Sequence, residues 1–200
     1  MRIHPKRSSI ALFIALVTFV PAASGVLVAC GDNEAAHSTT TSPSAAQPTT
    51  TTTSHEPFVS DLYGYSVDSW TGESAKTAWD GTGSPGDGDP TVDSLSGPKS
   101  QRAFGFAGPA KATLKRIVAK ARRTNAELRG CPSKPEKTES TTIDGEPAII
   151  DELHCGVFAL SATAIHDGHV YFFFTYDQPG KEAAMRAWFR SLIKDVSFGA

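Results

Sequence analysis

Apolar residues recur at helical spacing in two segments, one opened by Pro109 and the other running from Lys181 to Lys194. This spacing gathers the apolar side chains on one side of each helix, so it predicts two amphipathic helices. Pro109 suits the first turn of a helix, where an N–H would lack a partner in any case. The apolar residues at this spacing are Leu114, Ile117, Val118 and Ala121 in the first segment, and Met185, Trp188, Phe189 and Leu192 in the second.

Between the two helices the pattern changes to short runs that are typical of β-strands, at 138–143, 148–154, 157–165 and 170–176. The dipeptide Asp-Gly stands between the first two runs and again between the last two, and it is a strong hairpin signal when apolar runs flank it. The last run begins Val-Tyr-Phe-Phe-Phe and is apolar at successive positions. It therefore predicts a central strand that is covered on both faces.

The segment upstream of the first helix is less regular. Residues 58–70 contain spaced aromatic residues and predict a strand or hairpin, and Phe104-Gly105-Phe106 predicts a short strand that returns to the sheet. Residues 71–100 are dense in Gly, Pro, Asp and Ser, and they predict one long loop. Antiparallel strands with two helices laid against them predict an α+β fold.

The N-terminus has the pattern of a signal peptide at 1–29: three basic residues, an apolar run at 10–20, and then small residues. The next residues, Leu27-Val28-Ala29-Cys30, resemble the lipobox of bacterial lipoproteins. The resemblance implies a lipid on Cys30 and a chain anchored at the extracytoplasmic face of the cell membrane. Cleavage near Ala22-Ala23 by an ordinary signal peptidase, or an uncleaved membrane helix, remains an alternative.

A tether is expected to follow at residues 30–56. Its stretch 38–54 reads STTTSPSAAQPTTTTTS and has no charge and no aromatic residue. Such a segment buries too little apolar surface to offset the entropy of ordering, so we expect it to be disordered. It is either an O-glycosylated stalk or a bare spacer. Residues 57–200 then form a single globular domain of ordinary size.

Cys131 and Cys155 are the two cysteines that remain once Cys30 is assigned to the lipid. An even pair in an exported chain predicts a disulfide. Closing this loop stabilises the fold by about 3.5 kcal/mol in the chain-entropy description.

The charge balance excludes nucleic acid as a partner. Residues 1–29 contain three of the 19 basic residues and none of the 21 acidic ones, so the mature chain keeps 16 bases against 21 acids. Nucleic-acid binding needs a concentrated basic surface. One basic stretch stands out, because residues 111–129 hold seven bases and one acid, Glu127. It predicts either a solvated helix surface or a contact with anionic lipid or a partner.

Candidate chemical groups are few. His154, His166 and His169 lie in the hairpin half and are possible metal ligands, and Asp87, Asp89 and Asp93 have the odd spacing of a calcium loop. Val92 stands where the calcium loop needs glycine, and no spacing forces two imidazoles together. A serine-hydrolase elbow motif is also missing from the sequence. We therefore expect no catalytic residue, cofactor or metal site.

Several stretches of residues 58–200 together carry a family resemblance: Tyr63-Gly64-Tyr65-Ser66-Val67, Asp93, the stretch from Cys131 through Ile143–Ala148 to Cys155, the hairpin 166–174, and Trp188 to Phe198. With these residues the domain is similar to the small PsbP-like domains found on bacterial lipoproteins; PsbP itself is an accessory protein of the photosynthetic oxygen-evolving complex. The resemblance implies an antiparallel sheet packed between helices and an accessory or binding role instead of catalysis. The Thr-rich tether looks similar to those of actinobacterial lipoproteins.

The sequence thus indicates a membrane-anchored, non-catalytic binding or accessory module, whose partner is an envelope protein or a small ligand. Its alternatives are a metal-delivery protein and a tethered hydrolase. The predicted loop 71–100 is the expected binding surface, because long loops on rigid scaffolds often carry recognition. The aromatic residues Trp70, Trp79 and Phe104, in or beside it, either contact the ligand or, as we rather expect, pack under the loop.

Overall fold

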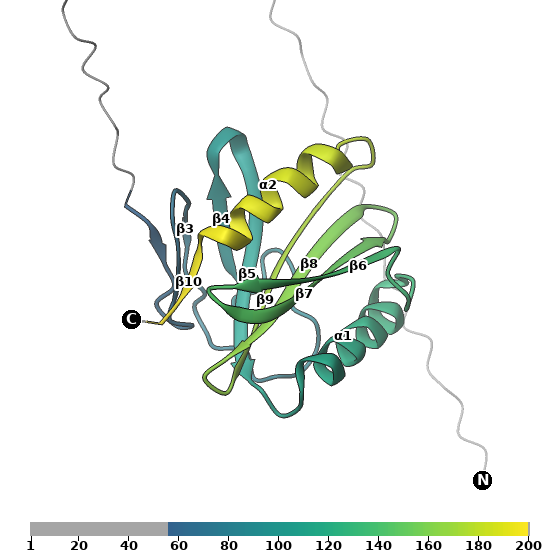
Figure 1. Cartoon of the computed structure of the whole chain (residues 1–200), viewed down its shortest axis with the longest axis horizontal. Helices are drawn as coiled ribbons and strands as arrows, with labels where there is room; N and C mark the ends of the chain where they lie inside the picture. The colour runs from purple at the N-terminus through teal and green to yellow at the C-terminus, as the bar shows by residue number, and fades with distance from the viewer. Residues whose placement is uncertain (1–55, 200) are drawn as a thin grey trace, which may run out of the picture. The chain divides into compact units, whose positions relative to one another are not determined.

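The computed structural model describes residues 56–199, and its main element is a seven-stranded antiparallel sheet (Figure 1). The strand order is β3-β4-β5-β9-β8-β7-β6. The bounds are β3 (Thr71–Glu73), β4 (Asp93–Gly97), β5 (Gln101–Pro109), β6 (Lys137–Ile143), β7 (Glu146–His154), β8 (Phe158–His166) and β9 (His169–Asp177). β9 stands in the middle of this order, so the prediction of a central strand at 170–176 is confirmed.

Two helices and a small second sheet complete the α+β fold. The helices are α1 (Leu114–Arg129) and α2 (Glu182–Asp195), close to the two segments that the apolar spacing predicts. Neither helix within residues 56–199 is long and apolar enough to cross a membrane. The second sheet has the order β1-β2-β10, with β1 (Phe58–Val59), β2 (Tyr65–Val67) and β10 (Val196–Phe198). β10 continues directly from α2, so the end of the described chain pairs with its beginning.

Two neighbouring acids on β7 show that the helices cover opposite faces of the large sheet. Asp151 pairs with Arg122 of α1, whereas Glu152 lies 2.8 Å from Arg186 and 3.7 Å from Arg190, both on α2. Successive side chains of a strand point to opposite faces, so α1 and α2 lie on opposite sides. Both carboxylates are almost fully buried, and each one holds its own helix to the same strand.

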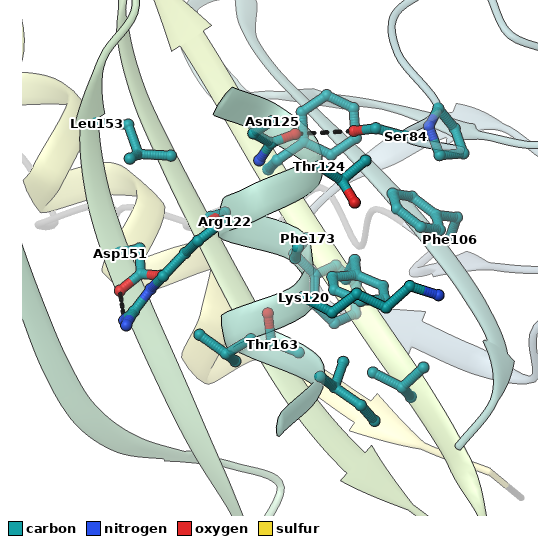
Figure 2. Close-up of a pocket in the computed structure, with 18 of the residues that line it drawn as sticks. Ser84, Phe106, Lys120, Arg122, Thr124, Asn125, Asp151, Leu153, Thr163 and Phe173 are labelled. Carbon is teal, nitrogen blue, oxygen red and sulfur yellow. Dashed lines mark hydrogen bonds and ion pairs between the residues drawn. The ribbon is translucent and has the colours of Figure 1, made fainter. Parts of the chain in front are cut away.

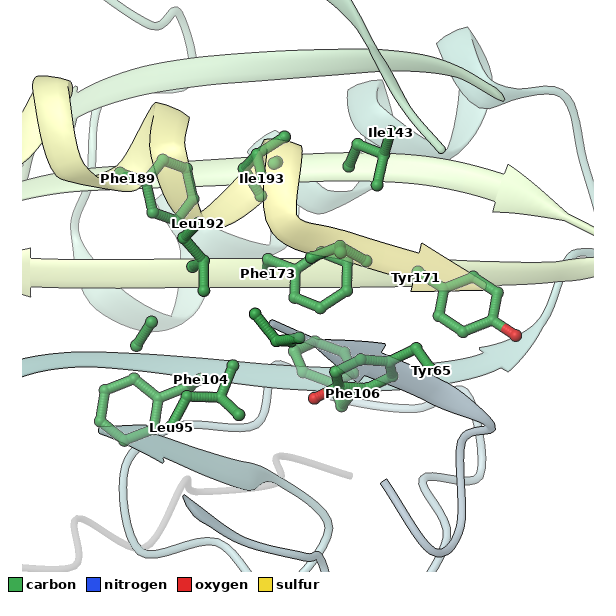
Figure 3. Packing of buried hydrophobic residues seen from close by; sticks show 14 of the residues in the cluster. Tyr65, Leu95, Phe104, Phe106, Ile143, Tyr171, Phe173, Phe189, Leu192 and Ile193 are labelled. Carbon is green, nitrogen blue, oxygen red and sulfur yellow. The ribbon is translucent and has the colours of Figure 1, made fainter. Parts of the chain in front are cut away.

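Most of the hydrophobic core lies on the α2 face, and Phe104 and Phe106 belong to the same cluster from the other face (Figure 3). Phe173 of β9 is completely buried on the α2 face, and its ring meets Tyr65 of the second sheet edge-on with centroids 5.0 Å apart. Phe189 and Leu192 of α2 cover the same area and are also completely buried. All members of this core cluster lie between Phe58 and Phe198, so the described region is a domain with a core of its own.

The prediction of one long loop at 71–100 is wrong at both ends. β3 and β4 pair with each other there, and β4 pairs with β5. The sequence pattern of both strands is weak, because β3 is an exposed edge strand without apolar residues and β4 contributes only Asp93 and Leu95 to the interior. The predicted short strand at Phe104–Phe106 is in fact the nine-residue β5, since it pairs with both β4 and β9.

Asp93 belongs to the interior and not to a calcium loop. Asp93 is completely buried, and its carboxylate accepts a 2.6 Å hydrogen bond from the Ala75 N–H. Burial raises the pKa of Asp93 despite that hydrogen bond. A raised pKa in the folded state favours folding below the pKa of the unfolded chain. That contribution is lost as the pH rises through the folded-state value, so the ionised form of Asp93 opposes folding.

The structure contains the predicted disulfide between Cys131 and Cys155. α1 ends at Gly130, which adopts the left-handed conformation (φ 66°) that favours glycine as a helix C-cap. Cys131 follows at once, and Cys155 follows the end of β7. The bond therefore fastens the C-terminal end of α1 to the sheet.

Candidate functional site

A cleft of about 560 Å³ lies between α1 and the sheet face opposite the main core (Figure 2). Its size falls within the range of roughly 300–1,000 Å³ that is usual for small-molecule sites. Side chains of β5, β7, β8 and β9 form the floor of the cleft, α1 forms its roof, and the segment 79–85 forms one side.

Aromatic side chains of β5 and β9 form the apolar part of the floor. Phe106 and Phe172 face each other across the two strands and stack, with ring centroids 4.9 Å apart. Trp79 packs edge-on against both rings, at 4.9 Å and 5.7 Å. Trp79 reaches this position because Gly108 leaves room for it: a Cβ added to Gly108 would lie 2.8 Å from the indole ring.

The β8 side chains that face α1 are small. Ser161 pairs with Phe174 and Thr163 pairs with Phe172, so each bulky ring on β9 has a small neighbour on β8. Ala159 likewise lies beside Tyr176. α1 therefore comes closest to the sheet over β8, and the cleft extends from there over β9 and β5.

The roof is held loosely by apolar contacts. Val118 is the one completely buried residue of α1, and Ile117 and Ala121, which also line the cleft, are only half-buried. A helix packed in a core buries a whole stripe of such residues. The predicted apolar stripe of α1 therefore faces the cleft more than it fills a core.

Polar contacts hold α1 in place instead. Arg122 donates two hydrogen bonds to the Asp151 carboxylate, at 2.8 Å and 2.6 Å, and Thr138 donates a third at 2.8 Å. The hydrogen bonds to Asp151 raise the pKa of the Arg122 guanidinium, so this arginine is charged at any physiological pH. Further toward the C-terminal end of α1, the Ser84 hydroxyl donates to Asn125 Oδ1 at 2.9 Å, and Arg129 donates to the carbonyl oxygens of residues 84 and 85.

The electrostatics of the cleft are positive. Five basic residues line it but only one acid, Asp151, which Arg122 already engages. Among the described residues, no carboxylate lies within 4.0 Å of the other four. Asp80 lies near the edge; its pKa is lowered mainly by hydrogen bonds from Thr82, and Lys111 contributes. The five basic residues are Lys111, Arg116, Lys120, Arg122 and Arg129.

The candidate metal ligands do not come together. His154 stands opposite Phe158 at one end of β8, whereas His166 and His169 face each other at the other end. The two ends of β8 are eight residues apart, so His154 lies roughly 26 Å from the other two histidines. The hypothesis of a three-histidine site is therefore wrong. Among residues 56–199, no three His, Cys, Asp or Glu side chains form a group that could hold a metal.

The expected binding surface at 71–100 is partly located at the cleft. Trp79 and the segment up to Pro85 line it, but Trp70 is buried against Trp188 and contributes nothing. Asp87 pairs with Arg102, and Asp89 bonds to Thr91, so these acids do not converge with Asp93. Cys30, the expected lipidation site, lies outside the described residues.

The sequence matches no protein-family model and no curated protein. Among solved structures, the fold is similar to cyanobacterial PsbP (CyanoP) from Synechocystis sp. PCC 6803, with a TM-score of 0.50 and 12% identity over 72% of this chain and 91% of that one. It also resembles a protein of unknown function from Pseudomonas aeruginosa, described as a putative regulator, with a TM-score of 0.38 and 14% identity over 50% of this chain and 74% of that one. The domain therefore has a PsbP-like α+β fold, as the sequence resemblance implies.

Proposed function

We propose that this chain is a non-catalytic binding module that holds an apolar small molecule in the cleft beneath α1, on a domain that Cys30 anchors to the membrane through a lipid. One observation carries the proposal: an aromatic-floored cleft of about 560 Å³ lies beneath a helix with a single completely buried side chain. Clefts of this kind, apolar with a few polar groups at the edge, are the usual form of ligand sites.

The polar groups of the cleft support binding over turnover. Asp151, the one carboxylate that lines the cleft among the described residues, already accepts three hydrogen bonds from Arg122 and Thr138. Ser161 and Thr163 stand on the floor, and none of the histidines within residues 56–199 lines the cleft. General acid–base catalysis needs a titratable group within hydrogen-bond reach of the reacting atom. An accessory or carrier role, as the PsbP-like fold suggests, fits this chemistry better than a hydrolase or a metal-delivery protein.

A neutral fluorophore tests whether the cleft accepts apolar ligands. We expect phenylnaphthylamine to bind the soluble chain from Gly31 onward, which retains the whole core, and to gain fluorescence as it enters the cleft. Ser161→Phe fills the space beside Phe174 and should weaken binding at least about tenfold, as loss of a well-buried apolar contact does. Titration followed by fluorescence measures both constants.

Ser161→Ala is the matched control, because it removes the hydroxyl and keeps the space; it should bind the fluorophore like the wild type. Equal binding by Ser161→Phe, with an unchanged melting temperature, would place the fluorophore elsewhere and remove the basis of the proposed function.

The anchor is tested separately in cells of a lipoprotein-producing bacterium. We expect the wild-type chain to partition into detergent and to incorporate labelled fatty acid, because the Leu27–Cys30 motif presents Cys30 for lipidation. Cys30→Ala should lose both properties, whereas Cys131→Ala should lose neither. A soluble secreted product of the wild-type gene would contradict the anchor and leave the cleft proposal standing.

A further inference from the structure

The basic residues of α1 that line the cleft leave the helix on two different sides. Arg116 and Lys120 are four residues apart, so they lie on the same side of the helix, in line with Thr124. Arg122 leaves the opposite side toward Asp151, whereas Lys120 extends toward the side of the cleft where Phe106 lies (Figure 2). Ile117 and Ala121 lie next to this row and also line the cleft. Two cations therefore border an apolar surface.

Arg116 and Lys120 are not used by the fold itself. Of the seven bases between residues 111 and 129, only Arg122 has a carboxylate within 4.0 Å among the described residues. Arg129 is engaged by the carbonyl oxygens of Ser84 and Pro85. Arg116 and Lys120 are exposed, and neither has a hydrogen-bond partner in the described region. Their charges are therefore available to a ligand in the cleft.

We propose that the cleft binds a single-chain amphiphile, with its alkyl chain over Phe106 and Phe172 and its anionic head group, carboxylate or phosphate, on Arg116 and Lys120. This proposal rests on the proposed function and specifies its ligand class. The floor supplies the apolar contact, and the unpaired cations supply the charge complement. Long basic side chains suit this position because their methylenes cover apolar surface while the charged end stays in water.

The remaining bases of α1 separate this proposal from a general attraction to anionic membranes. Lys115 and Arg123 are as exposed as Arg116 and Lys120, but they do not line the cleft. A helix that merely touched an anionic surface would use all four charges alike. A head-group site uses only the two at the cleft.

The test compares dodecanoate, dodecyl phosphate and uncharged dodecanol as competitors of phenylnaphthylamine on the chain from Gly31 onward. We expect the two anions to bind on the order of tenfold more tightly than dodecanol, as expected for a charge-assisted contact. The double variant Arg116→Gln/Lys120→Gln should lose this preference and keep dodecanol affinity. Lys115→Gln/Arg123→Gln removes the same number of charges and should keep the preference, and Lys120→Arg should retain it too.

Each other outcome overturns the inference. If dodecanol and both anions bind equally to the wild type, the head-group site is wrong and the apolar cleft stands. If both double variants lose the preference equally, the attraction is a general surface effect of α1. If no probe displaces the fluorophore, both the head-group site and the proposed function fail. A preference for only one of the two anions assigns the head group to that chemistry and supports the site.

Discussion

Phe173→Ala is expected to destabilise the domain by about 3–5 kcal/mol, the usual cost of removing a fully buried phenylalanine. Phe173 is completely buried between the sheet and α2, and its ring contacts Tyr65. Because the surrounding side chains close the resulting cavity only in part, the melting temperature should fall by ten degrees or more, roughly. Thermal unfolding followed by circular dichroism measures the loss.

Phe172→Ala is the matched control on the neighbouring residue of the same strand. Phe172 points to the opposite face, where it is half-buried on the floor of the cleft. Its removal should cost only about 1–2 kcal/mol, because less apolar surface is lost and no closed cavity forms. Phe172→Ala should also weaken fluorophore binding, and by more than Phe173→Ala weakens it when the affinity of the folded fraction of each variant is compared. Equal destabilisation by the two variants would mean that α1 packs onto the sheet and that no open cleft exists.

This pair of residues also shows what the sequence can and cannot predict. The run from Val170 to Phe174 identifies β9 as a central strand, because apolar residues on both faces need cover on both faces. The run does not say whether that cover is tight. Phe172 and Phe173 look alike in sequence, yet Phe172 is half-buried at the cleft and Phe173 is completely buried in the core. The difference depends on what stands beside each ring in the folded sheet.

The cleft itself arises from pairing between strands. Ser161 and Thr163 face the cleft because the β8–β9 register places them beside Phe174 and Phe172. A shift of the register by one residue would turn these small side chains toward the other face. The helices and the two Asp-Gly hairpins were predictable because their signals are local. β3 and β4 were not, since three exposed residues and a strand with a buried aspartate carry no apolar pattern.

Asp151→Asn is expected to loosen α1 while the rest of the fold stays intact. Asp151 is almost fully buried, and it receives two hydrogen bonds from Arg122 and one from Thr138. Removing one partner of a buried pair leaves the other charge uncompensated, at a cost of about 2–4 kcal/mol here, because Arg122 is partly exposed. α1 has few apolar contacts to replace this pair. Its amide hydrogens should therefore exchange faster than those of α2, and the fluorophore should dissociate faster.

Glu139→Gln is the control for this variant, because it breaks the more exposed ion pair between Glu139 and Arg190 of α2. Exposed pairs contribute at most about 1 kcal/mol, so stability, α1 exchange and fluorophore dissociation should stay near the wild-type values. Hydrogen exchange read by mass spectrometry separates the two helices directly. If Asp151→Asn lowers the melting temperature but α1 and α2 lose protection equally, Asp151 stabilises the whole domain. In that case α1 is an integral part of the core and not a roof held by polar contacts.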